Sequence, residues 1–165
     1  MNPFTVAAAA TLAIIALSQQ MSEAYGPSPW ADTTIIVRAS GSTLEFQPPR
    51  LSVEAGTRVR LRFVNDGTLP HNLVLPRRDD DIDALALAAY ESAETGYVPL
   101  AQKDKLVAYT ALVSPGETAE ITFEVPPAGE YTYVCLFPGH ANTMLGTLRA
   151  LRPRDKWGSE SHYSP

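Results

Sequence analysis

Hydrophobic and polar residues alternate along many short segments of this chain. Between Val59 and Phe63, apolar residues alternate with arginines, so a strand there would place the apolar side chains on one face and the charges on the other. Residues 121–125 repeat the pattern. The segments expected to be strands are Thr33–Ala39, Thr43–Phe46, Thr57–Asn65, His71–Leu75, Leu106–Val113, Thr118–Val125, Glu130–Leu136 and Gly146–Leu151.

Turn-forming residues separate these segments. Residues 65–67 read Asn-Asp-Gly, residues 114–116 read Ser-Pro-Gly, and residues 126–129 contain two prolines and a glycine. Many short strands joined by such turns predict an all-β protein in which two sheets pack as a β-sandwich.

One segment has a different period. Between Asp79 and Glu94, the apolar residues Ile82, Leu85 and Ala89 recur at helical spacing. Three consecutive aspartates at 79–81 stand where they can cap the first turn and interact with the positive end of the helix dipole. The pattern predicts a single helix inserted between the strands around His71 and Leu106.

The amino-terminal residues predict export. The first 22 residues carry no charged side chain, and residues 6–17 are an apolar run, shorter than the roughly 20 residues of a membrane span. Residues 1–24 are expected to be a signal peptide or, if retained, an N-terminal anchor, followed by a proline-containing linker at 25–32. Both alternatives place the protein in the periplasm or on the extracytoplasmic face of the membrane. Residues 152–165 are expected to be a flexible tail.

Composition sets limits on size and partners. A chain of 165 residues that is 45% hydrophobic can bury one core, so residues 33–151 are expected to form a single domain that acts as a monomer. The formal net charge of -5, with charges of both signs interspersed, argues against nucleic acid as a partner. The single cysteine excludes a disulfide within the chain.

Potential metal ligands are concentrated near the end of the chain. In YVCLFPGHANTMLGTL, Cys135 is followed by His140 after four residues and by Met144 after three more. A thiolate, imidazoles and a weak thioether are the donors of a trigonal copper centre that transfers single electrons. The second imidazole is expected from His71, in TLPHNLVL. The sequence therefore predicts a site for one copper ion, with Pro138 stiffening the ligand loop and Gly139 permitting its turn.

The motifs PHNLVL and CLFPGHANTMLGTL resemble those of the azurin and auracyanin branch of the blue copper proteins, the cupredoxins. The resemblance runs from about Thr33 to Leu151 and implies a Greek-key β-sandwich or barrel with one helical insertion. It implies that His71, Cys135 and His140 bind type 1 copper in a plane and that Met144 is a weak axial ligand.

The resemblance also assigns roles around the ligands. It implies that the carbonyl of Pro70 approaches the metal from the side opposite Met144. Asn72 would fix the cysteine loop by hydrogen bonds. The family commonly has Ser or Thr after the cysteine, but this chain has Leu136, so only the hydrogen bond from the backbone to Asn72 is expected. Phe137 is expected beside the ligands.

His140 is expected to be the exposed ligand, within an apolar docking patch formed by Leu69, Pro70, Phe137 and Pro138. The function implied is a mobile, non-enzymatic one-electron carrier between redox proteins such as cytochromes or membrane electron-transfer complexes. The membrane itself would be a partner only if the amino-terminal segment is retained.

Other site types fit less well. A structural zinc site lacks a fourth nitrogen or sulfur donor, and a cysteine hydrolase would require Cys135 in an activated position rather than at a strand end. Three histidines are too few for the additional sites of a copper enzyme, and His162 lies in the expected tail. A periplasmic copper carrier or storage protein remains the alternative.

Overall fold

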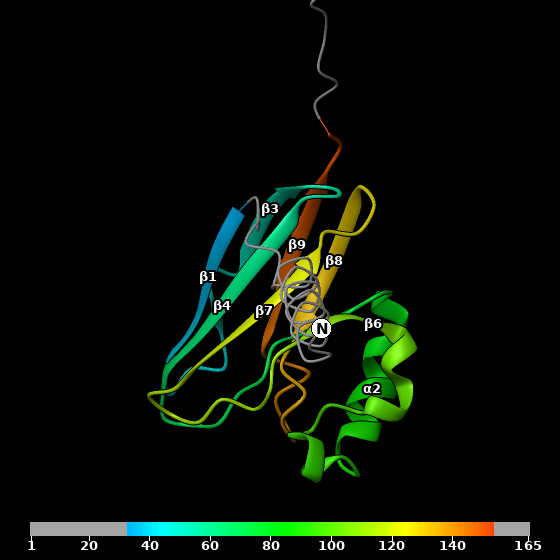
Figure 1. Ribbon diagram of the computed structural model, residues 1–165. Helices are drawn as coiled ribbons and strands as arrows, with labels where there is room; N and C mark the ends of the chain where they lie inside the picture. The colour runs from blue at the N-terminus through cyan, green and yellow to red at the C-terminus, as the bar shows by residue number, and fades with distance from the viewer. Residues whose placement is uncertain (1–32, 154–165) are drawn as a thin grey trace, which may run out of the picture. The chain divides into compact units, whose positions relative to one another are not determined.

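The computed structural model describes residues 33–153, which form two β-sheets packed as a sandwich (Figure 1). One sheet has the strand order β2-β1-β4-β7 and the other β3-β9-β8-β5-β6. This architecture confirms the predicted all-β sandwich. The strands are β1 (Thr33–Gly41), β2 (Phe46–Gln47), β3 (Arg50–Glu54), β4 (Arg58–Gly67), β5 (Val74–Pro76), β6 (Leu106–Tyr109), β7 (Thr118–Glu124), β8 (Gly129–Val134) and β9 (Leu145–Leu151).

Strands far apart in the sequence are neighbours in both sheets. β1 pairs with β4 and β3 pairs with β9 in parallel, whereas β8 pairs with both β5 and β9 in antiparallel fashion. The chain crosses between the sheets from β4 to β5 and from β7 to β8, as Greek-key connections require. The first crossing contains His71, and Cys135 follows β8 directly.

The sandwich core reaches the predicted ligands. The apolar residues of β4 are buried, as their alternation predicts. The ring of Phe46 packs against those of Phe63 and Tyr133, with centroid distances of 5.9 and 5.0 Å. Cys135 and Met144 belong to the same buried cluster. Two of the four predicted ligands are therefore part of the main core.

One strand was absent from the sequence prediction. β3 (Arg50–Glu54) buries Leu51 and Val53 and pairs with β9. The segment alternates with period two but has only two apolar residues and follows Pro48 and Pro49, which are typical of a loop. The sequence of β3 alone gives a weak strand signal, and the strand forms where it can pair with β9.

Two boundaries differ from prediction on the β4 side. The strand expected at Thr43–Phe46 forms only at Phe46–Gln47, paired with β1. The turn expected at 65–67 is wrong, because β4 continues through these residues and pairs with β1 as far as Gly67. Asn65 falls on the inward face of the alternation and is fully buried.

Two further strands are shorter than predicted. β5 begins at Val74 rather than at His71, which forms an isolated bridge with Val113. β6 ends at Tyr109. At the next residue, the side-chain hydroxyl of Thr110 accepts a hydrogen bond from the Leu73 N–H at 3.0 Å.

The insertion between β5 and β6 contains several short helices rather than the single predicted helix at Asp79–Glu94. They are η2 (Asp79–Asp81), α2 (Ile82–Ala89), η3 (Ala93–Thr95) and η4 (Leu100–Lys105), where η denotes a 3₁₀ helix. α2 ends because Ser92 donates from its hydroxyl to the Ala88 carbonyl at 2.9 Å and from its N–H to Ala89 at 3.0 Å. Asp79 does not cap the helix; its carboxylate accepts hydrogen bonds from Thr132 on β8.

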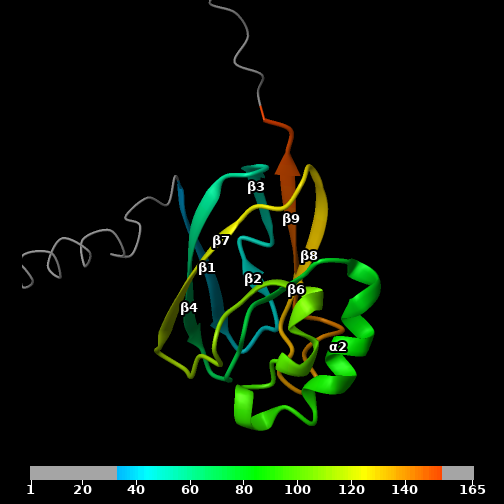
Figure 2. The same cartoon turned by 45° about the vertical axis from the view of Figure 1, so that its right-hand side comes forward.

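The insertion covers β5 and β8 (Figure 2). Its apolar face and these strands share a second buried cluster, separate from the main core. The cluster includes Leu136, which follows Cys135 directly, so the insertion is packed onto the backbone of the ligand region. The members of the cluster are Val74, Leu85, Ala89, Val98, Leu106, Val134 and Leu136.

The signal peptide or anchor expected at 1–24, the linker at 25–32, His162 and all but two residues of the expected tail lie outside the described residues. Within residues 33–153, no helix has the length and apolar character needed to cross a membrane.

Candidate metal centre

His71 is held between the two sheets. Its N–H donates to the Val113 carbonyl at 3.1 Å, and the Val113 N–H donates to the His71 carbonyl at 2.8 Å. The buried side-chain amide of Asn65 donates to the same Val113 carbonyl and to the carbonyl of Leu69, each at 2.8 Å. Both the bridge and the loop before His71 are therefore fixed by one residue of β4.

The other three predicted ligands lie in one tight loop after β8. The Cys135 N–H donates to the Met144 carbonyl at 3.1 Å, and the Met144 N–H donates to the His140 carbonyl at 2.8 Å. The His140 N–H closes a turn to the Phe137 carbonyl at 3.0 Å. Gly139 adopts a left-handed φ of 84° in this turn, as expected for the glycine of the motif.

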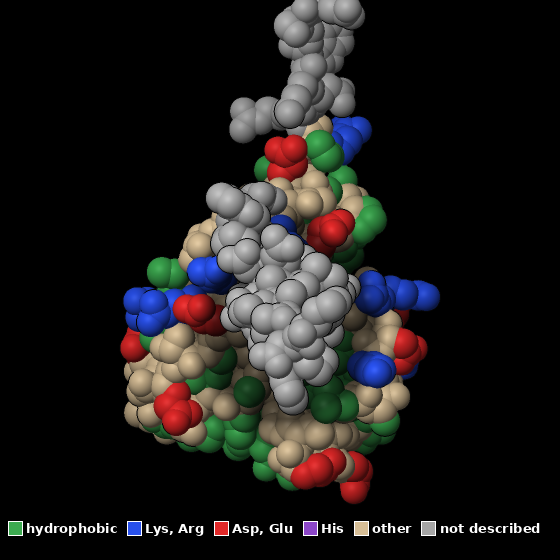
Figure 3. All heavy atoms as spheres, in the orientation of Figure 1, with side chains coloured by type: hydrophobic (Ala, Val, Ile, Leu, Met, Phe, Trp, Pro, Cys, Tyr) green, Lys and Arg blue, Asp and Glu red, His purple; other side chains and the backbone are tan. Residues whose placement is uncertain are grey.

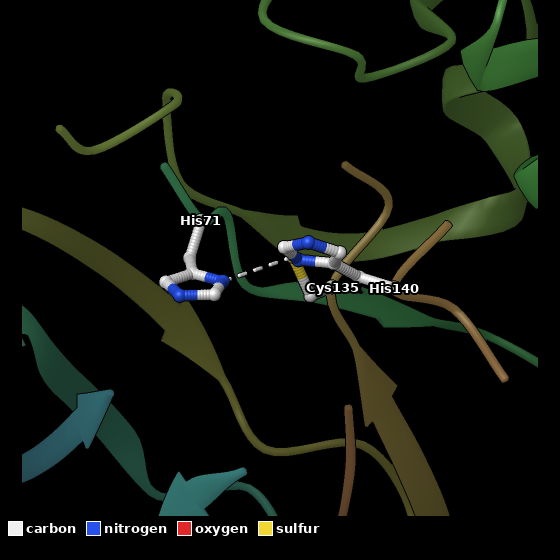
Figure 4. Close-up of side chains that lie close together, drawn as sticks. All are labelled: His71, Cys135 and His140. Carbon is white, nitrogen blue, oxygen red and sulfur yellow. Dashed lines mark hydrogen bonds between the residues drawn. The ribbon is translucent and has the colours of Figure 1, made fainter. Parts of the chain in front are cut away.

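The structure brings His71, Cys135 and His140 together (Figure 4). The Cys135 Sγ lies 3.8 Å from His71 Nδ1 and 3.6 Å from His140 Nδ1, and the three donor atoms lie within 4.8 Å of one another. Nitrogen and sulfur ligands at about 2.0 and 2.3 Å from one metal would be separated by roughly 3.5–3.7 Å in tetrahedral to trigonal geometry, close to the observed distances. The donor set fits a bound metal ion, and the fully buried Met144 follows in the same loop.

Asn72 fixes the cysteine loop through the backbone, as the sequence predicts. Its Oδ1 accepts a hydrogen bond from the Leu136 N–H at 2.7 Å. Its Nδ2 donates to the carbonyl of Gly96 at 2.9 Å, a contact with the helical insertion that the sequence did not indicate. Asn72 therefore links the His71 segment, the Cys135 loop and the insertion.

The buried position controls the protonation of the donors. Burial raises the pKa of the Cys135 thiol to about 11, although the backbone N–H groups of Asn72 and Phe137 favour the thiolate. Burial, and secondarily the nearby His140, lower the pKa of His71 to about 4; burial also lowers the pKa of His140. At neutral pH both imidazoles are thus neutral and able to bind a cation, and only the thiol must lose a proton.

The four residues differ in their access to solvent. Cys135 and Met144 are completely buried, His71 is 1% exposed and His140 is 6% exposed. The ring of Phe137 lies 4.9 Å from that of His140 between centroids. His140 is less exposed than the sequence suggested, but it has the largest exposed fraction of the four.

Sequence reasoning missed two groups of supporting residues. Asn65 was expected where the strand passes into a turn, although its place after Val59, Leu61 and Phe63 on the inward face is a signal that it is a buried polar residue. Gly96 and the neighbouring Tyr97, whose ring packs against Phe137 with a centroid distance of 5.1 Å, have no comparable local signal.

Comparisons with known proteins identify the metal. The family model for copper-binding proteins of the plastocyanin/azurin family matches residues 33–150. Auracyanin-B of Chloroflexus aurantiacus is 41% identical over 119 residues, which are 70% of this chain and 51% of auracyanin-B. The chain thus spans about half the length of that relative. Auracyanin-A of the same organism is 36% identical over 120 residues, covering 70% of this chain and 72% of auracyanin-A.

Solved structures give the same result. The structure of auracyanin A, described as a blue copper protein from the green thermophilic photosynthetic bacterium C. aurantiacus, matches with a TM-score of 0.67 at 35% identity. The match covers 71% of this chain and 97% of the auracyanin A chain. Sequence, fold and donor set agree, and the chain belongs to the plastocyanin/azurin family of copper-binding proteins, the blue copper cupredoxins, with copper as its cofactor.

Proposed function

We propose that this chain is a mobile one-electron carrier that exchanges electrons with redox proteins outside the cytoplasm. Copper held by a thiolate and imidazoles supplies the chemistry by alternating between Cu(II) and Cu(I). The observation that carries the proposal is the graded exposure of the ligands: Cys135 and Met144 are fully buried, whereas His140 keeps an exposed fraction of 6%. Such a site exchanges electrons through one ligand and exchanges metal slowly.

The protein's own contribution is rigidity. His71 is fixed by its bridge to Val113, and Met144 and Cys135 are joined by a backbone hydrogen bond. Ligands held in this way need little rearrangement when the charge of the metal changes. We assign Met144 as the weak axial ligand that tunes the potential and the carbonyl of Pro70 as a further weak axial donor.

The port for electrons is the edge of His140, and the docking patch comprises Leu69, Pro70, Phe137 and Pro138. Leu69 is exposed, and the other three members are half-buried. An apolar rim permits close approach without strong orientation, which suits a brief encounter. On the face drawn in Figure 3, charges of both signs are scattered and hydrophobic side chains gather along the lower edge.

The partners proposed are cytochromes or membrane electron-transfer complexes in the periplasm or at the extracytoplasmic face of the membrane. The support for this location is the apolar, uncharged run near the amino terminus. The sequence of this run is compatible with a removed signal peptide or a retained anchor.

Electron self-exchange of the copper-loaded protein tests the port. Leu69→Lys is expected to leave the visible spectrum unchanged but to slow self-exchange about tenfold at low salt, because two like charges must meet across the patch. Added salt should restore part of the rate. Leu151→Lys is the matched control: both leucines are 41% exposed, and Leu151 ends β9 at the opposite end from the ligand loop.

An equal rate in Leu69→Lys and the parent protein at low salt would show that electrons do not pass through this patch. The storage alternative is tested separately. An electron carrier should cycle repeatedly between blue and colourless forms while keeping its copper, whereas a storage protein should release copper to a chelator on reduction.

A further inference from the structure

The helical insertion contacts the copper site through a turn in an unusual conformation. Gly96 and Tyr97 have consecutive positive φ values of 67° and 63°, and Tyr97 is the only non-glycine residue with positive φ in the described part of the chain. A left-handed conformation is unfavourable for a tyrosine, because its Cβ comes close to the following carbonyl oxygen. Strain of this kind persists only where surrounding contacts determine it.

Two contacts of the turn lead toward the ligands. The Gly96 carbonyl accepts from Asn72, whose Oδ1 holds the Leu136 N–H of the cysteine loop. The ring of Tyr97 meets Phe137 edge to face at 5.1 Å and 75°, and Phe137 in turn lies 4.9 Å from His140.

The turn is also anchored on its other sides. The Tyr97 N–H donates to the Ser92 carbonyl at 2.8 Å, and the next residue, Val98, is buried in the second core cluster. A Cβ on Gly96 would lie 3.0 Å from the Cβ of Leu112, next to the Val113 that bridges His71. The turn thus sits between the segment that holds His71 and the loop that holds His140.

We infer that the Gly96–Tyr97 turn is a positioning element of the copper site, and that Tyr97 is its positioning residue. Through Phe137 it limits movement of the His140 ring, and through Asn72 it fixes the backbone that follows Cys135. Tyr97 does not bind the metal. The inference concerns the same site as the proposed electron carrier but depends only on copper binding, which spectra and metal release report without any electron transfer.

The test replaces Tyr97 by residues that separate its ring from its backbone conformation. Tyr97→Phe keeps the ring and should behave as the parent protein. Tyr97→Asn removes the ring but tolerates positive φ, so the copper-free protein should still fold, with a loss of stability limited to the packing of the ring against the second cluster. Its copper should nevertheless be lost to a chelator about 10- to 100-fold faster, the effect expected for loss of a group that orients a ligand, with a shifted charge-transfer spectrum.

Two further variants complete the design. Tyr109→Asn makes the same change at a tyrosine of β6 that is 40% exposed, and it should leave copper release unchanged. If Tyr97 acts through Phe137, Tyr97→Asn should have little further effect in a Phe137→Leu background.

Three results would overturn the inference. Copper release and spectra of Tyr97→Asn could match those of the parent protein. Its copper-free fold could be weakened in proportion to the faster release, which would make the role merely structural. Tyr109→Asn could have an equal effect.

Discussion

The β-sandwich supplies the ligands of the copper site, whereas the helical insertion supplies contacts to residues beside them. His71 forms an isolated bridge in the crossing between the sheets, and Cys135 follows β8 directly and belongs to the main core. The insertion reaches the site through a backbone carbonyl at Gly96 and a ring at Tyr97. One region creates the site and the other restrains it, so changes in the two should have different consequences.

The largest effect is expected within the sandwich. A Cβ at Gly146 on β9 would lie 2.1 Å from the ring of Tyr133, and that ring is held by its hydroxyl, which donates to the Pro48 carbonyl at 2.8 Å. Gly146→Ala should therefore reduce the free energy of unfolding by about 3 kcal/mol or more, with loss of copper binding. Urea unfolding measures this loss.

Gly116→Ala is the control for Gly146→Ala. A Cβ at Gly116 meets no atom within 4 Å, and only its positive φ of 82° opposes a side chain. Its cost should be about 1 kcal/mol. Similar losses in both variants would show that the contact with Tyr133 is unimportant.

The sandwich could be predicted from the sequence because a strand with one buried face leaves a period-two pattern, and β4 shows it as far as Asn65. The three donors that the structure brings together, with Met144 in the same loop, could be predicted because thiolate, imidazole and thioether groups are rare and lie at informative spacings. The insertion could not be predicted in detail. Its 3₁₀ turns carry little periodicity, and the Gly96 carbonyl that holds Asn72 has no sequence signature.

A second prediction concerns the interior of the insertion. Leu85 of α2 is completely buried in the second cluster, and Leu85→Ala should cost about 2 kcal/mol or more by leaving a cavity. Because Leu136 belongs to that cluster, the copper spectrum should also shift. Leu87→Ala, at a position 75% exposed on the same helix, should change stability by less than about 0.5 kcal/mol. A spectrum unchanged in Leu85→Ala would show that the insertion is not coupled to the ligand loop.

The third prediction contrasts the pH dependence of stability expected from His71 with that expected from Cys135. Unfolding returns the pKa of His71 from about 4 to 6.5, so the unfolded chain binds the proton more readily. Stability of the copper-free protein should fall as the pH drops from 6.5 toward 4. Unfolding returns the pKa of Cys135 from about 11 to 9.0, so stability should also fall as the pH rises from 9 toward 11.

Urea midpoints measured across this pH range provide the test. Cys135→Ser should reduce the alkaline decline without abolishing it, since burial also raises the pKa of Tyr133 above its ordinary value of 10.0. His71→Gln should likewise reduce the acid decline only in part, since carboxylates also titrate there. With copper bound, the part of the alkaline decline that depends on Cys135 should be absent from the parent protein because the metal already holds the thiolate. A copper-free Cys135→Ser protein that declines between pH 9 and 10 as steeply as the parent protein would contradict the assignment.

The smallest effect is expected at Met144, which belongs to both the ligand loop and the sandwich core. Met144→Leu conserves volume and should cost less than about 1.5 kcal/mol, but it removes a weak donor and should raise the reduction potential. Met144→Gln offers a harder oxygen donor that favours Cu(II) and should lower it. Each tenfold change in the relative affinity for the two oxidation states shifts the potential by about 59 mV. Redox titration of all three proteins decides between the two roles, because equal potentials would make Met144 a core residue only, whereas opposite shifts in the two variants would make it a ligand.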